Sequence, residues 1–144
     1  MINKKSITFI SCFFILVFNY SFGNYAFKKK IKTVCSSYRV SVDASAMDFG
    51  NNLFSLTLES NRNNFEMVML VGFASAGQAV SHQNSLGLSN AYVPKEISVR
   101  VNVPVSKGET MVFEATCSSD IAINLAAGTL DSSEFMQKID LVTS

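Results

Sequence analysis

The chain has 144 residues, 12 basic and 11 acidic side chains, a formal net charge of +1 and only three cysteines. Such a length favours a single domain that is large enough to bury a real core. Four of the basic residues lie together in the run "KKKIK" over residues 28–32, and the chain after it is mildly acidic. A nucleic-acid-binding domain carries basic residues across its body, so this class is excluded.

The N-terminus has the pattern of an export signal. Lys4 and Lys5 precede a nearly unbroken apolar run over residues 7–18, and the small residues Ser21 and Gly23 follow it. The run is shorter than the roughly 20 residues of a membrane-spanning helix. We therefore expect a signal peptide over residues 1–23, cleaved after Gly23. The competing interpretation is an uncleaved anchor. Cleavage places the mature protein in the periplasm or outside the cell, without a stable membrane span.

The mature chain is expected to begin with a basic arm over residues 24–33, followed by one β-rich globular domain over residues 34–144. The lysines of the arm suit an anionic surface, although a solvated tail explains them as well.

Two cysteines remain after removal of the signal, Cys35 and Cys117. An even number of cysteines in an exported chain predicts a disulfide between them. Closing so long a loop stabilises a fold by ~4.5 kcal/mol on chain-entropy grounds. A zinc site needs closely spaced Cys and His, and His82 is the only histidine, so no metal and no other cofactor is expected.

Alternation of apolar and polar residues predicts strands over residues 38–44, 53–59 and 97–103, and further strands over 111–117 and 120–126. The segment over residues 65–73 is apolar on nearly both sides, which is typical of a central strand. A turn is predicted over residues 104–110, with Gly108 as the residue of positive φ. Short strands between turns favour an all-β fold, an antiparallel sandwich or a partly open barrel. The C-terminal residues 131–144 fit either a helix, with Asp131 and Glu134 spaced as a capping box, or a strand, which we favour because it would cover a sheet edge.

A polar segment over residues 74–92 has no strand pattern and is predicted to be a long loop, a common location of function. Its amide, imidazole and phenol groups suit hydrogen bonding to a sugar or a protein backbone. The candidate binding residues are Gln78, His82, Gln83, Asn84, Asn90 and Tyr92.

Catalytic motifs are weak in this chain. In "FASAG", Ser75 lacks the first glycine of the hydrolase nucleophile elbow, because Phe73 occupies that place. We therefore expect a non-enzymatic, exported binding module that contacts a protein or glycan, in the manner of an adhesin, a receptor or an inhibitor. The alternatives are the receptor-binding subunit of a secreted toxin, an immunity protein that neutralises a toxin, and a small secreted hydrolase that uses His82. A further alternative is a structural surface protein that polymerises through exposed sheet edges.

Overall fold

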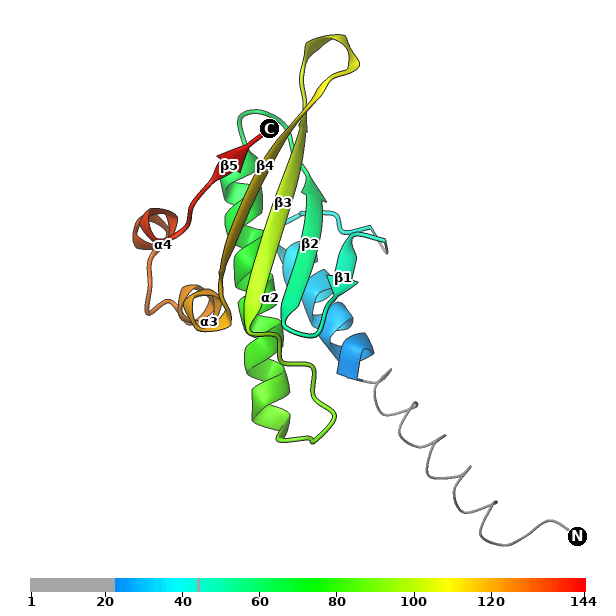
Figure 1. The fold of residues 1–144 in the computed structure, drawn as a ribbon, viewed down its shortest axis with the longest axis vertical. Helices are drawn as coiled ribbons and strands as arrows, with labels where there is room; N and C mark the ends of the chain where they lie inside the picture. Colours follow the sequence, from blue (N-terminus) through cyan, green and yellow to red (C-terminus); the bar gives the residue numbers. More distant parts are fainter. Residues whose placement is uncertain (1–22, 44) are drawn as a thin grey trace, which may run out of the picture.

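The computed structural model describes residues 23–43 and 45–144, so the predicted signal peptide lies outside the described residues apart from Gly23. In the described part, α-helices pack on a mixed sheet whose strands run in the order β1-β2-β3-β4-β5 (Figure 1). The prediction of an all-β antiparallel sandwich or partly open barrel is therefore wrong. The fold is α/β, and helices occupy two of the segments that were predicted to be strands, residues 65–73 and 120–126.

The N-terminal helix (residues 23–37) forms the first element. Phe27, Ile31 and Val34 recur at the spacing of one helix face, and all three are buried. The residues expected to form a basic arm are thus helical, and Phe27 contacts the rings of Phe54 and Tyr92 edge-on in the core. The predicted strand over residues 38–44 is a turn and an irregular connection in its described positions.

A long helix, α2 (Phe65–Leu86), connects the parallel strands β2 (Leu53–Glu59) and β3 (Glu96–Pro104). Parallel neighbours need such a crossover, because a short turn cannot return the chain to the same end of the sheet. The first half of α2 is the segment predicted to be a central strand. It is apolar on nearly every side because the sheet and other helices cover it. Its sequence therefore lacks the alternation of apolar and polar residues every three to four positions that marks a half-exposed helix. The prediction of a loop over residues 74–92 is wrong for residues 74–86, which belong to α2. The helix ends at Leu86, and Gly87 after it has a left-handed backbone conformation.

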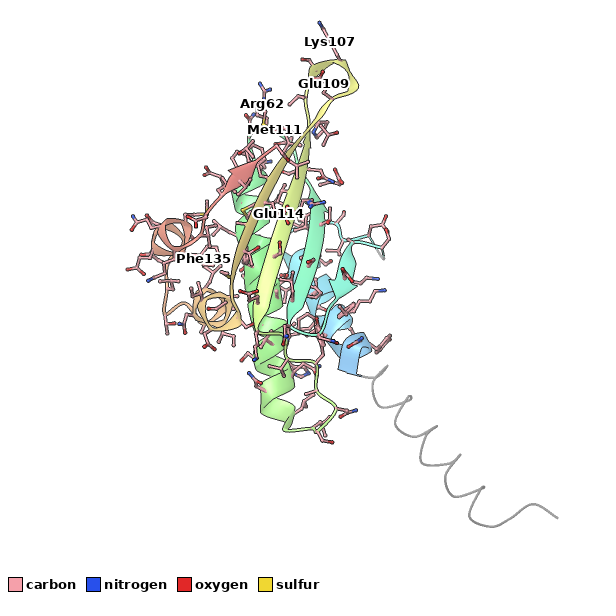
Figure 2. All side chains as sticks on the ribbon, viewed as in Figure 1. Arg62, Lys107, Glu109, Met111, Glu114 and Phe135 are labelled. Atoms are coloured by element: carbon pink, nitrogen blue, oxygen red, sulfur yellow. The ribbon has the colours of Figure 1, made fainter. Side chains whose placement is uncertain are left out.

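Strand β3 pairs antiparallel with β4 (Thr110–Ser118), and β1 (Met47–Phe49) pairs antiparallel with β2. The β3–β4 hairpin extends beyond the other strands and carries a short 3₁₀ turn, η1 (Ser106–Gly108), at its tip (Figure 1). Gly108 has a positive φ there, as predicted for this turn. Helix α2 covers one face of the sheet, and none of the described helices lies on the face toward the viewer in Figure 1. Figure 2 shows Glu114 over this uncovered face, where its carboxylate lies 3.0 Å from the guanidinium of Arg100.

The chain after β4 forms α3 (Ser119–Ala127), α4 (Ser132–Lys138) and β5 (Val142–Thr143). The predicted strand over residues 120–126 is thus a helix, whose first turn is capped by the side chain of Ser118. Asp131 and Glu134 form the capping box of α4, as in the helical alternative for residues 131–144. The strand that we favoured for this segment is present only at β5.

The predicted disulfide is also wrong: Cys35 and Cys117 are both free and buried. Cys35 lies on the N-terminal helix and hydrogen-bonds with the side chain of Ser75 on α2. Cys117 lies near the end of β4 and hydrogen-bonds with the backbone of Ala122 on α3. Each thiol is therefore packed against a different neighbour. An even number of cysteines indicates a pair only where the fold brings the two together, and this fold does not.

Candidate functional site

A groove of about 290 Å³ lies between the N-terminal helix, α2 and α3, and we call it the three-helix groove. It is lined by Lys30 from the N-terminal helix, by four polar residues of α2 and by three apolar residues of α3. The lining residues are Lys30, Gln78, Ser81, His82, Ser85, Ile123, Ala126 and Ala127.

The polar side of the groove follows from the period of α2. Gln78, Ser81, His82 and Ser85 stand at positions i, i+3, i+4 and i+7, so they share one helix face. The hydroxyl of Ser85 donates to the backbone oxygen of His82 at 2.7 Å, which leaves its oxygen lone pairs as acceptors. The face thus offers an amide, an imidazole and two hydroxyls to a ligand.

The apolar side depends on a close approach of two helix backbones. A Cβ atom at Gly77 of α2 would lie 2.5 Å from the carbonyl carbon of Ala122 on α3, so only glycine permits this separation. The approach holds α3 beside the polar face of α2. The small side chains of Ala126 and Ala127 then leave space above α3 that larger residues would fill.

Lys30 gives the groove its charge. Of the described residues that line it, Lys30 is the one with a fixed charge, and none is acidic. The lysines on either side of Lys30 in the sequence line a different hollow, on another face of the same helix. The three-helix groove is therefore a weakly electropositive site rich in hydrogen-bond donors.

The six predicted binding residues do not form one site in the structure. Gln78 and His82 lie in the groove. Gln83 is buried, and its side chain binds the backbone oxygen of Gly23 at 3.4 Å and the backbone N–H of Tyr92 at 3.1 Å. Gln83 therefore joins the start of the N-terminal helix to the segment after α2.

The other predicted residues are structural or peripheral. Tyr92 is buried against Phe27 and Phe49, and its hydroxyl donates to the backbone oxygen of Gly50 at 2.9 Å. Asn84 is exposed near the end of α2, and its carbonyl oxygen accepts from the C-capping N–H of Gly87. Asn90 lies in the connection that follows, beside Gly23, and does not line the groove.

The sequence analysis missed Lys30, Ser81, Ser85 and the residues of α3. If residues 74–86 had been predicted to be a helix, the groove residues of α2 would have been found, since polar residues recur there at spacings of three and four. Lys30 and α3 come from distant parts of the chain, and no local pattern connects them to α2.

Catalytic groups do not gather in the described residues. Ser75 is buried, and its hydroxyl donates to the backbone oxygen of Gly72 at 2.8 Å, so no substrate reaches it. No cluster of three or more His, Cys, Asp and Glu side chains suited to a metal occurs in residues 23–43 and 45–144. Burial raises the pKa of the Cys117 thiol to about 12, and burial also raises the pKa of Cys35. Thiols with such pKa values are poor nucleophiles near neutral pH.

Among the described residues, none of the helices has both the length and the apolar character needed to cross a bilayer. Comparison with known proteins found no matching family model, no matching curated protein and no matching solved structure.

Proposed function

We propose that the chain is an exported, non-enzymatic binding module that holds an acidic group of a protein or glycan partner in the three-helix groove. The observation that carries the proposal is the convergence of Lys30, Gln78 and His82 on one open groove with no carboxylate in its lining. A fixed positive charge beside several neutral donors favours an anionic group over a neutral one.

The size of the groove limits what it holds. Small-molecule pockets span roughly 300–1,000 Å³, and this groove, of about 290 Å³, lies just below that range. It suits one sugar ring or one side chain of a larger partner. Ile123 and the two alanines offer an apolar floor for the carbon skeleton of that group, while the polar residues of α2 face its oxygens.

The arrangement of the groove also supports binding over catalysis. The hydroxyl of Ser85 donates to a backbone carbonyl instead of the imidazole of His82. No lining residue is a carboxylate that would orient the imidazole as a general base.

The test is an NMR titration of the protein with three probes: a glucuronate-bearing oligosaccharide, its neutral glucose counterpart and an acidic peptide. We expect at least one acidic probe to shift the amide resonances of the groove residues, and the neutral sugar to bind more weakly. Lys30→Gln should weaken binding of the acidic probe roughly 10-fold or more, because a hydrogen bond to a charged group contributes about 1.5–3 kcal/mol.

Gln78→Ala and Asn84→Ala form a matched pair, because both remove an amide from α2 but only Gln78 lines the groove. Gln78→Ala should weaken binding, and Asn84→Ala should leave it unchanged. Absence of groove shifts with both acidic probes, or equal affinity of the wild-type protein and Lys30→Gln, would overturn the proposal.

A further inference from the structure

A second basic surface lies on the N-terminal helix, away from the three-helix groove. Lys28, Lys29 and Lys32 line a hollow of about 290 Å³ together with Tyr25 and Thr33. Lys32 also lines a neighbouring hollow that contains Arg39 and Ser36. We call the four cations, Lys28, Lys29, Lys32 and Arg39, the basic face. No acidic residue lines either hollow.

None of the cations of the basic face forms an ion pair with another described residue. Within the described part of the chain, the one salt bridge joins Arg100 to Glu114, in the sheet. Lys28 and Lys32 stand at i and i+4 on the helix, a spacing at which like charges repel each other and weaken the helix. The helix is instead held by its buried side, where Phe27 and Ile31 are fully inaccessible. The fold thus presents fixed positive charges that no described ion pair neutralises.

Arg39 strengthens this argument. Arg39 has a φ of 58°, in the left-handed region that favours glycine, and it stands two residues after the last residue of the helix. The backbone N–H groups of Arg39 and Val40 donate to the carbonyl oxygens of Ser36 and Cys35, at 3.0 and 2.9 Å, as in a helix C-cap. Glycine would adopt the same backbone conformation without strain, so this conformation does not explain an arginine here.

We propose that the basic face binds the anionic headgroups of a membrane surface. Its charge is complementary to a negatively charged leaflet, which attracts clustered basic residues near its surface. Tyr25, which is 63% exposed, stands beside the lysines with an aromatic ring and a hydroxyl, the combination found at membrane–water interfaces.

The proposal is tested by co-sedimentation of the full-chain protein with vesicles of phosphatidylcholine, with and without phosphatidylglycerol. We expect tighter binding to the anionic vesicles, and loss of that difference in ~1 M salt, where the Debye length falls to about 3 Å. The triple variant Lys28→Gln, Lys29→Gln, Lys32→Gln should bind the anionic vesicles on the order of 100-fold more weakly, since each lysine near an anionic surface contributes about 5-fold. Its binding to phosphatidylcholine alone should not change.

Two controls separate membrane recognition from net charge and from folding. Lys95→Gln, Lys107→Gln, Lys138→Gln removes the same charge from exposed sites elsewhere and should bind as the wild-type protein does. Arg39→Gly should raise the thermal midpoint, because it relieves the left-handed strain, and yet weaken anionic-vesicle binding about 5-fold.

Three results would overturn the proposal. The first is equal wild-type binding to the two kinds of vesicle. The second is equal loss in the two triple variants, which would show an effect of net charge alone. The third is displacement of the bound protein by millimolar inorganic phosphate at constant ionic strength, which would indicate a site for a free anion.

Discussion

Replacement of Gly77 by alanine tests the helix contact that shapes the three-helix groove. A Cβ atom at this position would lie 2.5 Å from the carbonyl carbon of Ala122, still closer to its oxygen, and 3.0 Å from the backbone nitrogen of Ile123. These are backbone atoms inside α3, so they cannot move aside without displacing the helix. Overpacking of this kind costs typically 1–3 kcal/mol.

Helix propensity acts in the opposite direction. Alanine in a helix interior is more stable than glycine by roughly 0.5–1 kcal/mol. The clash involves backbone, so we place its cost near the upper end of the range, and the net destabilisation of Gly77→Ala is then about 2 kcal/mol. For a domain of this size, such a loss lowers the thermal midpoint by on the order of 5–10 °C.

Gly72→Ala is the matched control on the same helix. Its Cβ would meet the Cγ1 of Val99 at 2.9 Å and the Cδ1 of Leu58 at 3.1 Å, which are ends of side chains. Small rotations of these side chains relieve the contact, so the change in stability should stay within about 1 kcal/mol. Thermal unfolding followed by circular dichroism measures both variants. A Gly77→Ala protein as stable as the wild type, or more stable, would refute the close approach of α2 and α3.

Two further predictions concern the buried thiol of Cys117 and the cap of α4. The raised pKa of Cys117 means that the unfolded thiol ionises first, so unfolding should become easier as the pH rises from about 9 towards about 12. In denaturant titrations, the free energy of unfolding should fall by up to ~1.4 kcal/mol per pH unit because of this thiol. Cys117→Ala should remove this pH dependence, and parallel pH profiles of the variant and the wild-type protein would contradict the raised pKa of Cys117. Asp131→Ala breaks the capping box with Glu134 and should cost about 0.5–2 kcal/mol in urea unfolding, whereas the exposed Asp140→Ala should cost almost nothing. Equal effects of these two substitutions would argue against the cap.

The sequence alone was sufficient to locate the strands that bury one face and expose the other. Strands β2, β3 and β4 have one covered and one open side, so their residues alternate, and this alternation located all three. The turn at Gly108 was likewise predicted from a local requirement, a residue that tolerates positive φ. Two residues of the groove, Gln78 and His82, were also among the candidates, on the chemistry of their side chains.

Only the tertiary structure decided the class of fold and the site. Helix α2 is covered by the sheet and by two other helices, so its apolar residues follow no single period, and its first half resembled a buried strand. The parallel pairing of β2 with β3 exists because α2 crosses between them, and it excludes a purely antiparallel sandwich. The number of cysteines is even, but the two pack against different neighbours and stay free. The sequence does not show this, because it does not give the distance between the two residues in the fold. The three-helix groove joins Lys30, α2 and α3 across most of the chain, and only packing brings such distant residues into one site.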